Sequence, residues 1–133
     1  MIIAKMNEAH VAEVAELEAL CFSEPWSEKS VASELTNSLS LWLVALEGEN
    51  VIGYVGSQTV MGWTDMMNVA VHPDHRRRGV GKALIEELIR QHPIESFGFT
   101  NTSINEVLKS IRTIYSEEQE HRYGVLALIL KKI

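Results

Sequence analysis

Residues 68–89 constrain the fold of this chain more than any other segment. They begin with Asn-Val-Ala-Val-His-Pro, continue as Asp-His-Arg-Arg-Arg-Gly-Val-Gly-Lys, and end with apolar residues at helical spacing. The valines predict a buried strand over residues 65–71, and Pro73 predicts its end because proline has no backbone N–H to donate. The spacing of the later apolar residues predicts an amphipathic helix over residues 81–91. The chain therefore runs from a strand through a Gly- and Arg-rich turn into a helix.

This turn predicts an anion site. The first backbone N–H groups of a helix have no partner within the helix, and the helix dipole is positive at that end. Gly79 and Gly81 can adopt positive φ, and they lack the Cβ atoms that would keep a pyrophosphate away from the backbone. A solvated basic turn, the plainer alternative, has no need of two glycines at this spacing. The residues predicted to hold a diphosphate are Arg76, Arg77, Arg78, Gly79, Val80, Gly81 and Lys82.

Two well-known phosphate loops fit the turn less well. A P-loop requires Ser or Thr after its lysine, but Ala83 follows Lys82. A dinucleotide-binding fingerprint requires a third glycine, and only Gly79-Val-Gly81 is present. The pattern Arg-x-x-Gly-x-Gly after a Val-rich strand instead resembles the acyl-coenzyme A loop of the GNAT N-acetyltransferase superfamily.

Hydrophobic periodicity along the rest of the chain predicts an α/β (α+β) fold. We expect one domain spanning residues 1–133, with a central mixed sheet flanked by about four helices. In the first helix we expect Asn7 as N-cap, with Val11, Val14, Leu17 and either Leu20 or Cys21 on the buried face. The expected strands are residues 2–6, 41–46, 51–60, 65–71, 94–100 and 125–130, and the expected helices are residues 8–21, 28–36, 81–91 and 103–113.

Composition narrows the functional class. The chain has 133 residues, of which 46% are hydrophobic, and no apolar run approaches the roughly 18 residues of a membrane span. It begins without the apolar region of a secretory signal, and its single cysteine, Cys21, fits a reducing compartment, so we expect a cytoplasmic protein. The net charge of −6 disfavours general nucleic-acid binding and suits amine-bearing substrates. The five histidines have no metal-ligand spacing, so we expect no metal.

Within the GNAT superfamily, residues 1–91 resemble the ribosomal-protein-alanine N-acetyltransferases of the Rim type. Three segments carry this resemblance: Glu-Ala-Leu-Cys-Phe-Ser-Glu-Pro-Trp-Ser from Glu18, Val-Ile-Gly-Tyr from Val51, and Asn-Val-Ala-Val-His-Pro from Asn68. The resemblance implies acetyl-CoA as co-substrate and a protein N-terminal α-amine as acceptor, such as that of a ribosomal protein. It also implies that pantetheine and the thioester bind along Val69, Ala70 and Val71, and that the acceptor site is bordered by Phe22, Glu24 and Trp26.

The C-terminal third departs from this branch, and two alignments are possible. One keeps every element and places Asn101, a further coenzyme-binding candidate, at the end of strand 94–100, with Leu108 where the family has its tyrosine. The other matches residues 96–99 to the family's Gly-Phe turn, but it omits a strand and a helix after Gln91. We prefer the first, because that loss would expose a large apolar area at about 25 cal/mol per Å². The family's glutamate then falls at about Ser96.

Acetyl transfer to an amine requires a neutral amine, a polarised carbonyl and a proton for the departing thiolate. Asp65 is the first candidate base, because the histone-acetylating branch of the superfamily has its catalytic glutamate at this place in the strand. Glu95 is the rival base, and Tyr115 is the candidate acid. A purely structural role is the alternative for three of the candidates. Asp65 would then be a strand-start residue, Tyr115 a core residue, and Trp26 a core plug.

The function that these patterns favour is acetyl transfer from acetyl-CoA to an N-terminal α-amine. Acetylation of a small amine or of a lysine is an alternative function, and a non-catalytic coenzyme A-binding module is another. Either a monomer or a homodimer is compatible with the sequence. Nucleic-acid binding through the arginine cluster is disfavoured, because no aromatic residues are interleaved with it.

Overall fold

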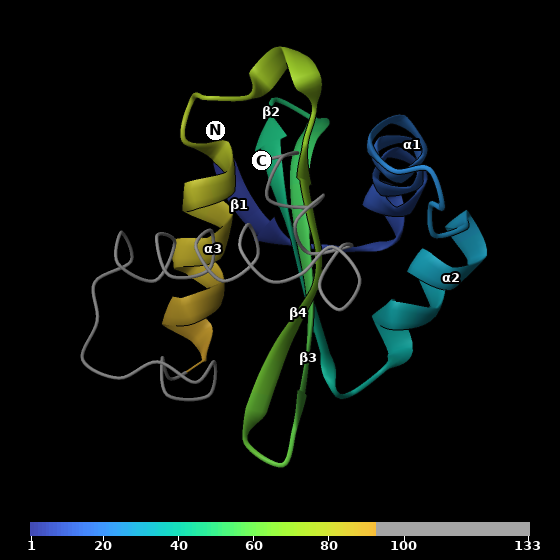
Figure 1. The fold of residues 1–133 in the computed structure, drawn as a ribbon, viewed down its shortest axis with the longest axis vertical. Coiled ribbons are helices and arrows are strands. Elements are labelled where there is room, and N and C mark those ends of the chain that lie inside the picture. The colour runs from blue at the N-terminus through green and yellow to red at the C-terminus, as the bar shows by residue number, and fades with distance from the viewer. Residues whose placement is uncertain (93–133) are drawn as a thin grey trace.

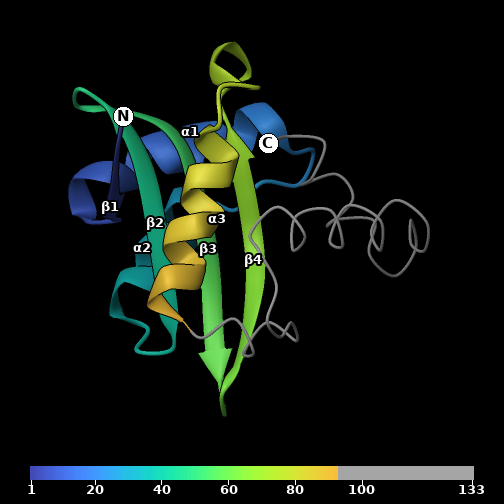
Figure 2. The ribbon, with the colours of Figure 1, turned by 90° about the vertical axis from the view of Figure 1, so that its left-hand side faces the viewer.

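The structure is a computed structural model, and it describes residues 1–92. Its centre is a four-stranded antiparallel sheet in the order β1-β2-β3-β4 (Figure 1). The strands are β1 (Ile2–Lys5), β2 (Ser40–Glu47), β3 (Asn50–Val60) and β4 (Trp63–Val71). Helices α1 (Val11–Cys21) and α2 (Glu28–Ser33) cover one face of the sheet, and α3 (Val80–Gln91) covers the other (Figures 1 and 2). The sheet is therefore the middle of three layers.

Each face of the sheet has its own apolar core, because successive side chains of a strand point to opposite faces. The core under α1 and α2 includes Val14, Val31, Trp42 and Tyr54. The core under α3 is built from other residues of the same strands and from Val80, Leu84 and Leu88 of the helix. β4 contributes Ala70 to the first core, and Val69 and Val71 to the second.

The elements predicted for residues 1–92 are confirmed, with small shifts at their ends. The helix expected over residues 8–21 starts as a 3-10 turn, Glu8–His10, and the helix expected over residues 28–36 ends as another, Glu34–Thr36. Asn7 caps the first turn, because its side chain accepts a hydrogen bond from the N–H of Ala9. Cys21 lies on the buried face and is 5% exposed, whereas Leu20 is 56% exposed.

Some predicted elements lie outside the described residues. These are the strands over residues 94–100 and 125–130 and the helix over residues 103–113.

All the strand pairs between residues 1 and 92 are antiparallel. Within the same range, no helix is long and apolar enough to cross a membrane.

β4 contains a β-bulge that the sequence did not predict. Gly56 pairs with Asn68, and Ser57 pairs with Met66, so Met67 has no partner on β3. A bulge shifts the alternation of side chains by one residue. As a result, Asn68 faces α1, to which it is hydrogen-bonded, although Met66 packs against the α3 core.

Gly56 of β3 lies in close contact with the Trp42 ring, in the core under α1 and α2. A Cβ atom on Gly56 would lie 2.5 Å from Cε2 of Trp42. The Trp42 ring cannot move freely, because it stacks on Tyr54 with the ring centroids 5.8 Å apart. We therefore expect Gly56→Ala to lower the free energy of unfolding by about 1–3 kcal/mol. Denaturant titration measures this loss.

Gly53→Ala is the matched control on the same strand. A Cβ atom there would lie 3.1 Å from its nearest neighbours, so smaller movements relieve the contact and we expect a smaller loss. Equal stability of the Gly56 variant and the wild type would contradict the close packing of Trp42 on β3.

Candidate active site

The turn between β4 and α3 has the geometry of an anion site. After β4 the chain forms a 3-10 turn, Pro73–His75, and then passes through Arg77 at φ +62° to Gly79 at φ +81°. Gly79 is the N-cap of α3 and supplies no side chain to cap it. The N–H groups of the first helical turn, those of Val80, Gly81 and Lys82, therefore have no intrahelical partner. A Cβ atom on Gly79 would meet nothing within 4 Å, so the space beside this N-cap residue is open.

The two glycines of the turn differ: both can adopt positive φ, but only Gly79 does so. Of the described glycines, only Gly48, Gly62 and Gly79 have positive φ. Gly81 is buried within the first turn of α3. The reason is the place at which the helix begins: the residue before the first turn adopts the left-handed conformation, and the next residues are already helical.

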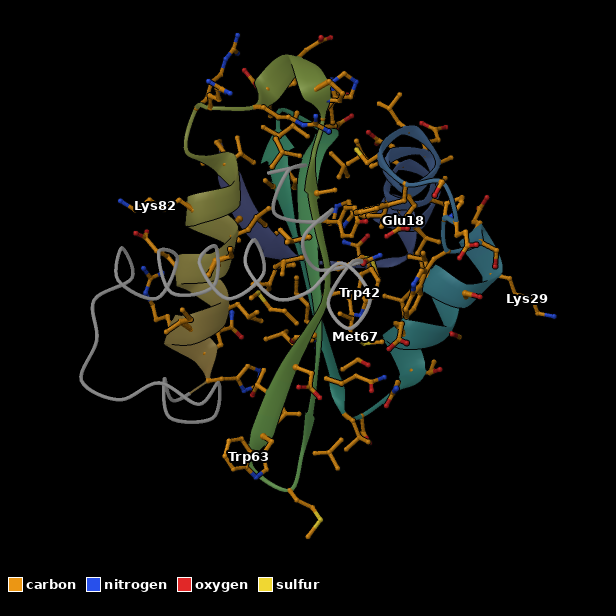
Figure 3. The ribbon with its side chains drawn as sticks, viewed as in Figure 1. Glu18, Lys29, Trp42, Trp63, Met67 and Lys82 are labelled. Atoms are coloured by element: carbon orange, nitrogen blue, oxygen red, sulfur yellow. The ribbon has the colours of Figure 1, made fainter. Side chains whose placement is uncertain are left out.

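The basic side chains of the turn also separate into two groups. Arg76 points inward, where its Nε donates to the carbonyl oxygen of Val71 at 3.0 Å and its Nη2 lies 3.4 Å from Sγ of Cys21. It thereby links the end of β4 to the end of α1. Arg77, Arg78 and Lys82 are exposed around the start of α3. Lys82 projects away from α3 (Figure 3), with its Nζ 4.0 Å from Oε1 of Glu86.

Residues 69–71 present backbone groups at the outer edge of β4. β4 is the last strand in the sheet order of the described residues. The N–H of His72 donates to Ile52 of β3, whereas the carbonyl of Val71 points away from β3, toward Arg76. By antiparallel alternation, the N–H and C=O of Val69 and Val71 face the outer edge. The side chains of residues 69–71 are buried, so the backbone is what this edge offers to a ligand.

The loop of residues 22–27 lies between α1 and α2. Phe22 is half-buried and packs against both cores, and Glu24 is exposed. Trp26 is half-buried, with its ring 5.3 Å from that of Trp42 and tilted by 55°. Part of the Trp26 ring therefore packs on the core, and part is accessible from outside.

A buried carboxylate, which was not among the predicted site residues, lies beneath this loop. Glu18 is fully buried between α1 and the sheet (Figure 3). Its Oε2 accepts a hydrogen bond from the N–H of Trp26 at 3.1 Å, and its Oε1 accepts from the Tyr54 hydroxyl and the Asn68 amide. The sequence held one signal for it, a glutamate four residues after Val14 on the apolar face of α1.

Burial raises the pKa of Tyr54 far above its ordinary value of about 10, and the negative charge of Glu18 raises it further. Tyr54 therefore stays protonated and donates to Glu18.

Because Tyr54 loses its proton at a lower pH in the unfolded chain than in the folded one, its contribution to stability is intact below pH 10 and falls as pH rises above that value. We expect Tyr54→Phe to have a lower Tm near pH 7 but a shallower fall of Tm above pH 10. Thermal melts between pH 8 and 11 check this, and parallel curves would contradict it.

Asp65 is exposed on β4 and pairs with Gln58 of β3. Since the neighbouring Met66 packs against the α3 core, Asp65 faces the α1 and α2 layer. It thus shares a face with Asn68 and Ala70, although the bulge separates it from them. The other predicted catalytic residues, Glu95 and Tyr115, and the coenzyme-binding candidate Asn101 lie outside the described residues. Residues 1–92 contain no group of three metal-ligating side chains.

The sequence matches the family model "Acetyltransferase (GNAT) family" over residues 11–113. The [ribosomal protein bS18]-alanine N-acetyltransferase of Escherichia coli (strain K12) is 29% identical over 87 residues. These residues cover 65% of this chain and 58% of that enzyme, so the chain spans little more than half the length of this relative.

Solved structures agree with the fold. The crystal structure of the ribosomal-protein-S18-alanine N-acetyltransferase from Escherichia coli matches with a TM-score of 0.62 and 28% identity, over 68% of this chain and 57% of that one. An aminoglycoside 6'-N-acetyltransferase complexed with coenzyme A has a TM-score of 0.61 over 68% of this chain and 54% of that one. At 19% identity, the latter supports the fold alone.

Proposed function

This chain belongs to the acetyltransferase (GNAT) family, and from this premise we propose that it transfers an acetyl group from acetyl-CoA to a primary amine. One observation carries the proposal: the left-handed Gly79 at the uncapped start of α3, beside the edge of β4 that no other strand of residues 1–92 covers. A diphosphate and an extended thiol arm need these two features next to each other. The fold supplies both at the same end of β4.

In the proposed complex the pyrophosphate of acetyl-CoA accepts hydrogen bonds from the N–H groups at the start of α3. Arg77, Arg78 and Lys82 surround that point with positive charge. The pantetheine arm extends along β4 and pairs with the outward backbone groups of Val69 and Val71, much as an added strand would. A backbone N–H of the same edge then polarises the thioester carbonyl where negative charge develops.

We propose that the acceptor is a protein N-terminal α-amine. The Escherichia coli relatives named above support this choice, because their names specify alanine of a ribosomal protein. An α-amine, with a pKa of about 8, is partly neutral near pH 7.5, whereas a lysine with a pKa of about 10.4 requires more help. Asp65 on the acceptor-facing side is the proposed base, with Glu95 as its rival and Tyr115 as the proposed acid.

Calorimetric titration with acetyl-CoA tests this function, followed by thiol release after addition of a peptide with N-terminal alanine. Binding and release together would support the transferase. Binding without release, on this peptide and on a panel of small amines, would favour a non-catalytic coenzyme A-binding module. Absence of binding would overturn the assignment of the β4–α3 turn.

Trp26 tests the position of the acceptor site. If its accessible edge contacts the acceptor, Trp26→Ala should raise the acceptor KM by about tenfold or more, as expected when an apolar contact is lost. Steady-state kinetics at saturating acetyl-CoA measure the change.

Trp63→Ala is the control, because Trp63 is 64% exposed at the far end of the β3–β4 hairpin (Figure 3). We expect that variant to keep the wild-type KM. A lower Tm of Trp26→Ala with an unchanged acceptor KM would show that Trp26 only seals the core.

A further inference from the structure

Glu18 joins parts of the chain that are distant in sequence. Its carboxylate binds the backbone of the 22–27 loop at Trp26, the hydroxyl of Tyr54 on β3 and the amide of Asn68 on β4. A buried carboxylate is strongly destabilising unless hydrogen bonds replace its hydration. Here both oxygens of the carboxylate accept at least one hydrogen bond.

The partners of Glu18 border the two sides of the candidate site. Trp26 belongs to the loop proposed to border the acceptor. Asn68 directly precedes residues 69–71, which are proposed to hold the thioester, and Tyr54 pairs with Ala70 at the centre of that segment. One carboxylate thus connects the acceptor wall to the strand that binds the acyl donor.

We propose that Glu18 is a positioning residue that fixes the 22–27 loop relative to β4, and so determines where the amine meets the thioester. This inference rests on the proposed function. A second contact holds the same loop, because the Trp26 ring packs on Trp42, which in turn stacks on Tyr54. That contact is apolar and has a less strict direction than a hydrogen bond. Glu18 is therefore the partner that fixes the position of the loop backbone at Trp26.

An apolar residue could fill the same volume without the penalty of burying a charge. Such a residue would leave the N–H of Trp26 and the amide of Asn68 without their acceptor. The three hydrogen bonds therefore impose an orientation on the loop that packing alone does not impose.

Three variants separate positioning from general stability. Glu18→Ala removes the acceptor of all three hydrogen bonds. Glu18→Gln keeps its shape, and it keeps the contacts if the Asn68 amide and the Tyr54 hydroxyl turn to accept. Val14→Ala is the control, because Val14 is equally buried one turn earlier on α1 but makes no polar contact with the loop.

The readouts are amide hydrogen exchange of residues 22–27, the acceptor KM and the affinity for acetyl-CoA. We expect Glu18→Ala to speed exchange of the Trp26 amide and to raise the acceptor KM by about 10–100-fold, as displacement of a reacting group does. The affinity for acetyl-CoA should change much less than the acceptor KM, since Glu18 has no hydrogen bond to the start of α3 and residues 69–71 stay paired with β3. Glu18→Gln should restore most of the wild-type behaviour, and Val14→Ala should lower Tm without moving the acceptor KM.

An acceptor KM for Glu18→Ala no higher than that for Val14→Ala would overturn the inference, as would unchanged exchange at Trp26. A wild-type protein that releases no thiol with any amine would instead overturn the proposed function. Hydrogen exchange would then still decide whether Glu18 holds the loop.

Discussion

Replacing Gly79 with aspartate is expected to abolish acetyl-CoA binding while the chain stays folded. The new carboxylate would stand at the uncapped start of α3, where the pyrophosphate is proposed to bind. Two like charges about 4 Å apart repel by about 4 kcal/mol at an effective dielectric constant near 20. That repulsion corresponds to about a thousandfold in affinity, and we expect a loss of at least about a hundredfold. Calorimetric titration measures the loss.

Gly62→Asp is the matched control for this variant. Gly62 also has positive φ, at +83°, and a Cβ atom there would meet nothing within 4 Å. The two substitutions therefore introduce the same charge and a similar backbone strain of about 1–2 kcal/mol. Gly62 lies in the β3–β4 turn, at the opposite end of the sheet from the start of α3 (Figure 1). If both variants bind acetyl-CoA as the wild type does, the anion site is elsewhere.

Replacing Asp65 with asparagine is expected to lower kcat by about 100-fold or more, the usual contribution of a general base. Asparagine keeps the size of the side chain but cannot take a proton. Asp65 is exposed, so the fold should be unaffected, and acetyl-CoA affinity should stay at the wild-type value. Steady-state kinetics with an N-terminal alanine peptide, combined with thermal melts, measure both quantities.

Asp74→Asn is the control for charge alone. The Asp74 side chain is 84% exposed in the 3-10 turn before Arg76, so its replacement removes one negative charge outside the proposed acceptor face. A kcat for Asp65→Asn equal to that for Asp74→Asn would exclude Asp65 as the base, and Glu95 would become the next residue to replace.

Periodicity was sufficient to predict the elements between residues 1 and 92. Helix α3 was predictable because Val80, Leu84 and Leu88 recur at helical spacing, and they do pack in the core between α3 and the sheet. A glycine-rich turn between β4 and α3 was predictable from the sequence, and Gly79 in it does adopt a positive φ, which glycine does without steric cost. Its detail was not: the sequence does not show which glycine precedes the helix, and that choice separates Gly79 from Gly81.

The inner parts of the site required three-dimensional structure. Arg76 belongs to a run of three arginines, and nothing in that run distinguishes the one that turns inward to Val71 from its exposed neighbours. The role of Glu18 depends on Tyr54 and Asn68, which lie 36 and 50 residues further along the chain. Hydrogen bonds over such separations leave no local pattern. The sequence showed only that a carboxylate stands on an apolar helix face.

The unpaired Met67 also determines which mutations could turn the Asp65 side chain to the other side of the sheet. Successive residues of a strand face opposite sides of the sheet, so the position of a residue in the strand fixes the side that it faces. The bulge interrupts this alternation, and the order of the two sides is reversed between the two halves of β4. Substitutions can change the chemistry of residues 63–66, but they cannot change the layer that these residues face. Deletion of one residue at the bulge would exchange both faces of this outer half at once, turning Asp65 toward α3 and Met66 toward α2. Length variation here would therefore turn Asp65 away from the proposed acceptor face in a single step, while residues 69–71, which are proposed to hold the acyl donor, would keep their pairing with β3.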